Sequence, residues 1–408
     1  MKVSTRRFGP GALVTAAFIG PGTVTVCTLA GVNDGYSLLW VMLIAIIVCY
    51  LLQEMAARLG VVARLGLAEA LRLELSQPLL RFIMLGIVLA AIVVGNAAYE
   101  AGNISGATLG LQPLIGTWRI EVNDLTFSPV NLLIAALAFV LLYRGSYALL
   151  EKILISLVLL MSVAFLFVAI TTRPSIYDLL GGFVPRMTAN QTLTVIGLIG
   201  TTVVPYNLFL HARIVQERWS GPESLPAMRQ DAALAIVLGG CMSMAIIVSA
   251  AAIQGTDVAN AAQLALALEP VFGGYAKFIL AFGLFAAGIT SAITAPLAAS
   301  YVSNGCLGWP QDLTSRSSRA VWITVLLAGL LFSMLGGSPI EIIRFAQITN
   351  GILLPLIAGF VLWGLNRKNL LGDYVNSVWQ NLLGALVLLV VTVLAGRSLW
   401  LVVGTLRW

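Results

Sequence analysis

Long apolar runs dominate this sequence and constrain its fold more than any other feature. Only 10% of the 408 residues are charged, against about 25% in soluble proteins, and apolar runs of roughly 20 residues recur along the chain. The mean hydropathy is +0.97. These runs are continuous and do not alternate, which excludes a transmembrane β-barrel. The sequence therefore predicts an all-α membrane protein with about eleven spans, expected near residues 11–33, 37–58, 79–110, 130–143, 150–171, 191–218, 231–254, 271–305, 319–336, 339–364 and 379–404.

Two of these runs contain helix-breaking residues near their midpoints. Gly20-Pro21-Gly22 interrupts the first run, and Pro205 in Val203-Val-Pro-Tyr-Asn207 interrupts the sixth. Proline removes a backbone donor and clashes with the preceding turn, and glycine adds flexibility. Paired breaks at corresponding positions of two halves indicate a solute site at mid-depth in a transporter, because broken helices expose carbonyls and helix ends there. The alternative is a pair of proline kinks in ordinary packed helices.

The position of the two breaks also predicts how the chain is organised. We expect a single transmembrane transporter domain over residues 1–408, with one repeat over about 11–171 and a second over about 191–364. Five spans per repeat is an odd number, so the second repeat must enter the membrane from the opposite side, which makes the repeat an inverted one. The last span, about 379–404, is left as an addition.

Basic residues gather in alternate joints between the spans and predict the orientation. Arg6 and Arg7 precede the first span, further arginines and lysines follow spans two, six and ten, and the opposite joints are poorer in them. The positive-inside rule then places the N-terminus in the cytoplasm of a multi-pass inner (plasma) membrane protein. The membrane topology explains the net charge of +6 better than binding to nucleic acid would. The expected partners are therefore the lipid bilayer and a small-molecule or ion substrate. We expect the chain to act as a monomer. At the end of span two, Glu54 and Arg58 have the i,i+4 spacing of an ion pair.

Several classes of chemistry are excluded by what the sequence lacks. It has no G-x-x-x-x-G-K-[ST] motif, so gradients and not ATP hydrolysis must drive any transport. A single histidine excludes a multi-histidine metal site. The four cysteines show no paired spacing, which argues against a disulfide or a zinc site. No nucleophile–base pair or metal-ligand set is present, so we do not expect an enzyme, and we expect no cofactor.

Neutral oxygen and amide side chains surround both breaks. Thr23 follows the first break, Thr201, Tyr206 and Asn207 surround the second, and Gln347 lies in span ten. A hard cation such as Mg²⁺ takes oxygen ligands, keeps several waters and usually needs one or two carboxylates, which are missing here. The alternative for each threonine is that it only caps backbone groups freed by the break.

Glu100 is the ionisable residue that stands out within a predicted span, and Asn103 lies one turn away on the same helix face. Such a residue marks a pathway or a proton relay by default. The alternative places Glu100 near the outer membrane edge, in water or paired with an arginine. His211 lies one turn beyond Asn207, and its imidazole can titrate near neutrality or serve as a buried hydrogen-bond donor.

These stretches together resemble the natural-resistance-associated macrophage protein (NRAMP) family of divalent metal transporters. The resemblance implies the LeuT-type inverted repeat with broken helices one and six. The similar segments run in family order, and they are Gly20-Pro-Gly-Thr, Gly35-Tyr-Ser-Leu-Leu-Trp40, Gln53-Glu-Met-Ala-Ala-Arg-Leu-Gly-Val-Val62, Leu67-Ala-Glu69, Val204-Pro-Tyr-Asn-Leu-Phe-Leu-His211, Ala287-Gly-Ile-Thr-Ser-Ala-Ile-Thr294 and Gln347 to Pro355.

The chain departs from the family at the residues that bind the metal. The family's first break reads Asp-Pro-Gly-Asn, and here Gly20 and Thr23 replace its metal-binding aspartate and asparagine. The second break reads Met-Pro-His in the family and Val204-Pro-Tyr206 here, so the metal-binding methionine is absent as well. The resemblance therefore identifies a divergent member. We expect Gly20 and Val204 to face each other across a cavity at mid-depth.

Other family positions are recognisable by alignment. The resemblance places the family's backbone-carbonyl ligand at Thr201 and its span-ten glutamine at Gln347. The acidic pair of span three, which serves proton movement in the family, corresponds to Glu100 and Asn103, and the histidine pathway of the second break keeps only His211. The resemblance thus implies a proton or cation pathway at these last three residues.

The sequence predicts a secondary-active transporter of NRAMP-like type that moves a small solute by alternating access. A divalent cation, Mg²⁺ or Mn²⁺ foremost, is the expected cargo, with Thr23, Thr201 and Gln347 as candidate ligands. Neutral dipoles in place of an anionic ligand cost several kcal/mol at a desolvated ion, so two alternatives stay open. One is a relative repurposed for a non-metal polar or anionic solute, which helix N-termini at the breaks would suit. The other is a non-transporting membrane sensor.

Overall fold

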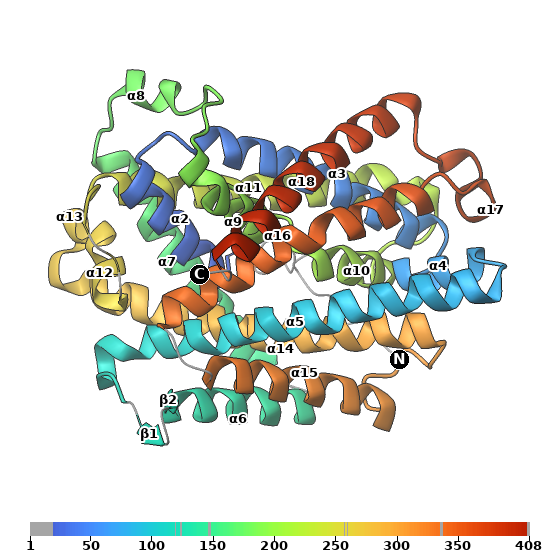
Figure 1. Ribbon diagram of the computed structural model, residues 1–408, viewed down its shortest axis with the longest axis horizontal. Helices are drawn as coiled ribbons and strands as arrows, with labels where there is room; N and C mark the ends of the chain where they lie inside the picture. Colours follow the sequence, from blue (N-terminus) through green and yellow to red (C-terminus); the bar gives the residue numbers. More distant parts are fainter. Residues whose placement is uncertain are drawn as a thin grey trace.

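The apolar runs form long helices that lie side by side along the molecule (Figure 1). The computed structural model describes residues 19–118, 120–122, 125–145, 148–256, 258, 260–334 and 338–405. Within these residues the longer elements are α2 (Pro21–Asp34), α3 (Leu39–Val62), α4 (Leu67–Glu74), α5 (Pro78–Ile115), β1 (Ile120–Val122), β2 (Leu125–Phe127), α6 (Pro129–Arg144), α7 (Ala148–Thr171), α8 (Ile176–Gly181), α9 (Thr192–Thr202), α10 (Pro205–Ile214), α11 (Leu225–Ala251), α14 (Ala276–Leu307), α15 (Arg316–Met334), α16 (Pro339–Gly364) and α18 (Val378–Thr405). Shorter helices are α12 (Ala261–Ala265), α13 (Glu269–Phe272) and α17 (Lys368–Leu371).

Most of the predicted spans are present as helices. In the part of the chain that the structure describes, nine helical segments are long and apolar enough to cross a membrane, and Pro129–Arg144 is a shorter apolar helix at the predicted fourth span. The first span is described only from Ile19 onward, so its first half, like Arg6 and Arg7, lies outside the described residues. Helices suit such runs because no water in the bilayer core can bond to a free backbone group.

The two ends of the bundle differ in charge. At one end, which carries α4 and α17 (Figure 1), Arg58 donates to the carbonyl oxygen of Tyr374 and Arg64 donates to that of Gln216. We call this the basic end. The opposite end carries α8, α12 and α13 (Figure 1), and there Gln191 donates to the carboxylate of Asp34. The joints after predicted spans two and ten therefore lie at the same end of the fold, and the side of the membrane that this end faces stays a prediction.

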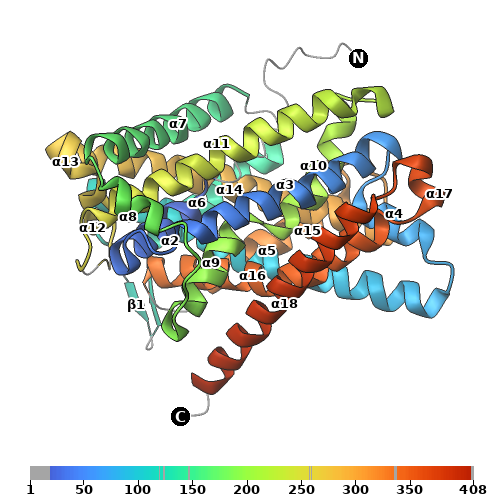
Figure 2. The same cartoon turned by 90° about the horizontal axis from the view of Figure 1, so that it is seen from above.

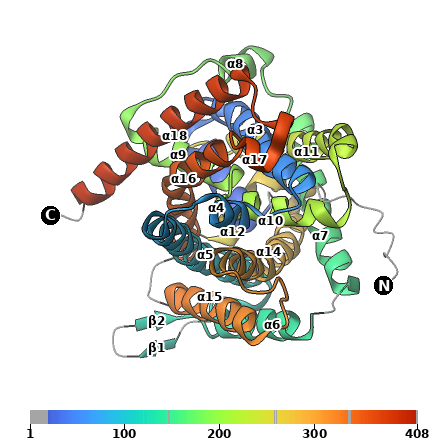
Figure 3. The same cartoon turned by 90° about the vertical axis from the view of Figure 1, so that its right-hand side faces the viewer.

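The second half of helix α5 is largely buried, the helix packs on α14, α15 and α16, and α6 lies beside α15 (Figure 3). Small residues allow these backbones to approach closely. A Cβ atom added at Gly106 would collide with Pro21 of α2, and one at Gly288 of α14 would meet Ala107 at 2.6 Å. Helix α5 therefore packs directly against the start of α2.

Helix α18 slants away from the bundle toward the C-terminus (Figure 2) and packs on α16, where Gly384 leaves room for Leu362. Its outer face is apolar and exposed, for example at Leu386 and Val393. Such a face suits lipid, because lipid tails are as apolar as leucine. This helix is the addition beyond the two predicted repeats, and that division into repeats stays a prediction.

Candidate solute site at the helix breaks

The sixth predicted span is interrupted where the sequence indicates. Helix α9 ends at Thr202 and α10 begins at Pro205, with Val203 (φ −106°, ψ 74°) and Val204 (φ −76°, ψ 120°) outside helical geometry. Proline is well suited to the first position of a helix, where its missing N–H would be free in any case. The interruption leaves carbonyl groups at the end of α9 without intrahelical partners. The alternative of a mere proline kink in one continuous helix is wrong for this span.

The described part of the first span begins its helix immediately after Gly20. Helix α2 begins at Pro21, and Gly20 before it is extended (φ −83°, ψ 173°). Gly20 still accepts the first helical bond, from the backbone N–H of Val24 at 3.3 Å. The segment before Ile19 lies outside the described residues, so the structure describes one side of this break.

The two breaks meet through a pair of threonines. Thr23 Oγ1 and Thr201 Oγ1 form a hydrogen bond of 2.9 Å across 178 positions of sequence. The side chain of Gln347 in α16 lies directly against Gly22, and its backbone carbonyl oxygen lies directly against Gly200. The three polar side chains are each 2% exposed or less. We call this set (Gly20–Thr23, Thr201–Asn207 and Gln347) the break crossing.

Several polar atoms of the break crossing have no partner. The oxygen Oε1 of Gln347 and both amide atoms of Asn207 are buried and find no hydrogen-bond partner among the described residues. A buried polar group left unpaired costs about 1–3 kcal/mol, and such groups are rare in native proteins. The break crossing therefore has oxygen acceptors available for a ligand.

No set of charged metal ligands accompanies these oxygens. Within the described part of the chain, no group of three or more histidine, cysteine, aspartate or glutamate residues lies close enough together to hold a metal ion. The donors at the break crossing are hydroxyls, amides and backbone carbonyls. This set fits a hard cation that keeps part of its hydration shell, or a neutral polar solute.

Glu100 lies deep in the protein, beside the break crossing and not in it. Its side chain is 0% exposed, packs on Gly329 of α15 and accepts a hydrogen bond of 3.1 Å from Asn103. The alternative of a water-exposed or arginine-paired glutamate is wrong, since no ion pair to Glu100 occurs among the described residues. Its second oxygen, Oε1, has no partner.

His211 lies further along α10, toward the basic end. Its Nδ1 lies 2.8 Å from Oε1 of Gln53 in α3. An amide oxygen can only accept, so this contact assigns the proton to Nδ1 and leaves Nε2 as an acceptor. Nε2 is buried without a partner. Asn207 and His211 therefore lie one turn apart on α10, each with an unpaired acceptor. Glu100 lies on a different helix, α5.

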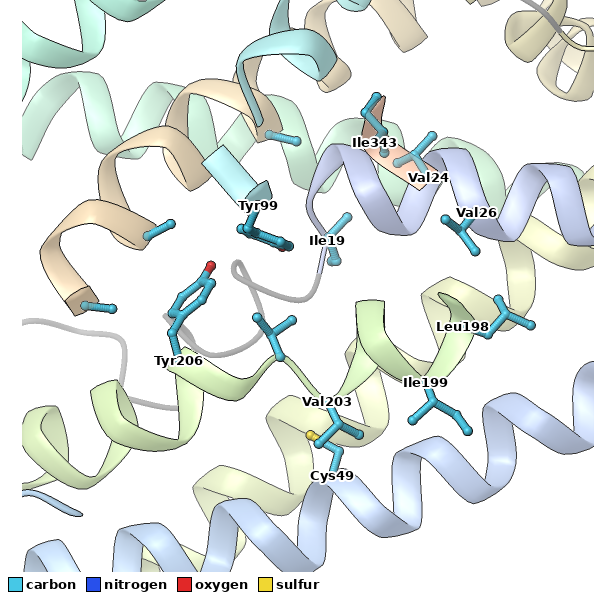
Figure 4. Packing of buried hydrophobic residues seen from close by; sticks show 14 of the residues in the cluster. Ile19, Val24, Val26, Cys49, Tyr99, Leu198, Ile199, Val203, Tyr206 and Ile343 are labelled. Carbon is cyan, nitrogen blue, oxygen red and sulfur yellow. The ribbon is translucent and has the colours of Figure 1, made fainter. Parts of the chain in front are cut away.

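Tyr99 is a residue that the sequence analysis missed. It lies on α5 with its ring centroid 5.3 Å from that of Tyr206, edge to face at 66°, and Figure 4 shows the two rings pointing toward each other with Ile19 beside Tyr99. The sequence signal that could have identified Tyr99 was its position next to Glu100. An aromatic residue in an apolar span gives no indication by itself of which neighbour it meets.

The predicted ion pair of span two is confirmed and is larger than expected. Arg58 Nη2 lies 3.4 Å from Oε2 of Glu54, and Arg229 Nε of α11 lies 2.9 Å from Oε1 of the same carboxylate. Arg58 also donates to the side-chain oxygen of Asn376, before α18. We call Glu54, Arg58 and Arg229 the charge network.

Comparisons with known proteins show which family and which solved structures this chain resembles. The family model described as natural resistance-associated macrophage protein-like (Nramp) matches residues 11–401. The chain is 29% identical over 99% of its length, and 95% of the relative's, to the divalent metal cation transporter MntH of Klebsiella pneumoniae. It superposes on a crystal structure of a mutant of the Eremococcus coleocola manganese transporter with a TM-score of 0.76 at 20% identity, covering 97% of this chain and 87% of that one.

A more distant likeness extends to other transporters of the LeuT type. Mhp1, a nucleobase-cation-symport-1 family transporter, superposes with a TM-score of 0.54 at 15% identity over 98% of this chain and 92% of its own. The predicted fold class, an all-α membrane protein of LeuT type, is confirmed by these likenesses. The family match over residues 11–401 shows that the chain belongs to the natural resistance-associated macrophage protein (Nramp) family.

Proposed function

We propose that this protein is a secondary-active transporter that moves a divalent cation, Mg²⁺ or Mn²⁺ foremost, by alternating access. Its family membership and the names of its relatives, a divalent metal cation transporter and a manganese transporter, support this proposal. The observation that carries it is the meeting of the two breaks at the Thr23–Thr201 hydrogen bond, with the side chain of Gln347 beside them. Three segments far apart in sequence thereby bring neutral oxygens to one buried point.

One helix end at this point favours a cation. Helix α9 ends there, and a helix C-terminus carries a partial negative charge because its last carbonyls are unpaired. The acceptor Oε1 of Gln347 and the acceptor Oδ1 of Asn207 are also unpaired. A cation that displaces the Thr23–Thr201 hydrogen bond can therefore be bound by hydroxyl, amide and carbonyl oxygens.

The missing carboxylate determines how the cation is held. Mg²⁺ dehydrates reluctantly and keeps several waters, so neutral dipoles can bind it through its hydration shell. Removing all waters would leave its charge uncompensated in a low-dielectric site. We therefore propose a largely hydrated cargo, with Thr23, Thr201 and Gln347 contacting its waters or replacing a few of them.

Glu100, Asn103 and His211 are proposed to form the pathway of the coupling proton or of the cation. Glu100 and Asn103 are hydrogen-bonded on α5, and His211 has a free acceptor on α10. Ionisable groups at membrane depth are costly and are kept for such roles. By the positive-inside rule the basic end and the N-terminus face the cytoplasm, and we propose that the chain works as a monomer.

The test is uptake into liposomes that contain the purified full chain. We expect Mg²⁺ or Mn²⁺ uptake under an imposed proton gradient and a heat of binding by calorimetry. Thr23→Phe and Thr201→Phe should abolish both signals, because each fills the break crossing. Thr324→Phe is the matched control, since Thr324 is exposed on α15 and bonds only to its own helix.

A second candidate function is transport of a small polar or anionic non-metal solute. The observation that favours it is the start of both α2 and α10 at the break crossing, because a helix N-terminus attracts negative charge. Uptake of a metabolite panel, measured in the same liposomes without metal response, would replace the cation proposal by this one. If neither class of solute moved, the sensor alternative would stand instead.

A further inference from the structure

Tyr99 and Tyr206 lie at the edge of the break crossing nearest the basic end. Helix α5 runs from Pro78, beside α4, toward the opposite end, and its Gly106 contacts Pro21 at the first break. Tyr99 precedes Gly106 by seven residues, which on a helix is about 10 Å closer to the basic end. Tyr206 likewise follows the second break, on the helix that leads to the basic end. Both tyrosines therefore lie toward the basic end from the Thr23–Thr201 hydrogen bond.

Polar residues follow Tyr206 along α10 toward the basic end. Asn207 and His211 follow Tyr206 along α10 and present unpaired buried atoms. Near the far end of α10, a crevice of about 10 Å³ touches Phe209, Arg213 and Tyr301, and a volume of this size holds about one water. Unpaired polar atoms therefore follow the rings along α10, and the crevice lies further along the same helix.

Tyr99 is also linked to the proposed ligands. Tyr99 lies on α5, which packs on α16, the helix that carries Gln347, and the side chain of Gln347 lies against Gly22 at the first break. The two rings are fully buried, each 1% exposed.

We propose that Tyr99 and Tyr206 together form the constriction that closes the break crossing toward the basic end, and that Tyr99 is a specificity-determining residue of the transporter. The edge-to-face contact blocks the route when the rings touch. When they separate, the gap between the rings limits the size of the solute and of the hydration shell that leaves with it. This inference rests on the proposed function for its cargo, but the closure itself is independent of the cargo.

The test measures leak as well as transport in liposomes that contain the full chain. We expect Tyr99→Ala and Tyr206→Ala each to raise the passive Na⁺ leak several-fold, up to about tenfold, the change that corresponds to losing a ring–ring contact of this kind. The double variant should leak no more than the faster single one, because both rings close the same gap. Tyr99→Phe and Tyr206→Phe keep the rings and should stay within about twofold of the parent leak.

A matched control pair exists away from the breaks. Phe139 of α6 and Trp322 of α15 also meet edge to face, with centroids 5.4 Å apart at 60°. Phe139→Ala should leave the leak unchanged. If the tyrosine variants leak no more than Phe139→Ala, the proposed constriction is overturned.

Two further measurements keep the outcomes separable. If an alanine variant does not fold, Tyr99→Leu and Tyr206→Leu replace it, since leucine fills part of the volume but cannot make the ring–ring contact. An increased leak in a protein that takes up no divalent cation would support the constriction and reject the cargo. Normal uptake with unchanged leak and unchanged preference between Mg²⁺ and Mn²⁺ in these variants would reject the constriction alone.

Discussion

The break crossing and the charge network bury polar groups in opposite ways. In the charge network, both oxygens of the Glu54 carboxylate contact a guanidinium group, and Arg58 has further acceptors near α18. In the break crossing, the polar side chains are neutral, and several of their atoms have no partner. Glu54 and Arg58 are as buried as the break crossing, so burial alone does not account for the difference.

The difference shows which buried polar groups serve stability and which are available for binding. A buried charge must be paired, because an unpaired one costs several kcal/mol. An unpaired neutral amide costs less, about 1–3 kcal/mol, and the protein can carry a few of them. Gln347 and Asn207 are such groups. A ligand that pairs with them recovers that cost when it binds.

The largest expected effect is the loss of the charge network. Glu54→Gln leaves the guanidinium of Arg58, 3% exposed, without a carboxylate, and should lower the free energy of unfolding by about 3–5 kcal/mol. Thermal unfolding in detergent measures this loss. Glu223→Gln, at an exposed residue, is the control and should leave stability unchanged. If both variants were equally stable, the charge network would not stabilise the fold, and the contrast with the break crossing would fail.

A methyl group at Gly200 should have the next largest effect. Gly200 lies against the backbone carbonyl of Gln347, whereas Gly22 lies against the flexible end of the Gln347 side chain. Gly200→Ala should therefore force α9 and α16 apart, lowering the free energy of unfolding by about 1–3 kcal/mol. Gly22→Ala should displace only the amide and weaken uptake with less loss of stability. Measuring unfolding and uptake of both variants tests this expectation. A larger loss of stability in Gly22→Ala than in Gly200→Ala would contradict it.

Removing one hydroxyl at the break crossing should have a smaller effect. Thr23→Val keeps the shape but loses the hydrogen bond to Thr201, which contributes about 1 kcal/mol. We expect near-normal stability and a roughly fivefold weaker apparent affinity for the cargo, since about 1 kcal/mol changes an equilibrium by that factor. Uptake measured against cargo concentration checks this. A collapse of stability as large as that of Glu54→Gln would mean that Thr23 has a structural role.

The smallest expected change in stability is that of Glu100→Gln. Glutamine keeps the shape and can still accept from Asn103, so the free energy of unfolding should stay within about 1 kcal/mol of the parent. Its effect should fall on coupling, because glutamine cannot take up a proton. Uptake compared at acidic and neutral external pH should lose its pH dependence. Unchanged rate and pH dependence would exclude Glu100 from the proton pathway.

Much of the fold could be predicted because each apolar run is constrained on its own. The i,i+4 pair of Glu54 and Arg58 was equally local, and it is present. Arg229, the third member of the charge network, lies 175 positions away in sequence from Glu54. Its contact depends on how α11 packs against α3, which no spacing rule contains.

Proline alone did not identify the breaks. Pro113, Pro296 and Pro355 lie inside continuous helices α5, α14 and α16, whereas Pro21 and Pro205 begin α2 and α10. Neighbouring helices can satisfy the backbone groups that a proline frees, so a helix can continue through it. The matching positions of two breaks in the two halves were the stronger signal.

The sequence by itself determined that this chain crosses a membrane as helices, and it located the interruption between α9 and α10. Both follow from local chemistry. Backbone groups in lipid must form their hydrogen bonds within their own segment, which favours helices. A helix is interrupted where a proline cannot donate the next backbone hydrogen bond. Only the tertiary structure decided that Thr23 meets Thr201, that Tyr99 meets Tyr206 and that Glu100 turns toward α15. Those contacts depend on the rotation and depth of each helix, which are set by close packing at glycines such as Gly106 and Gly329 from distant parts of the chain.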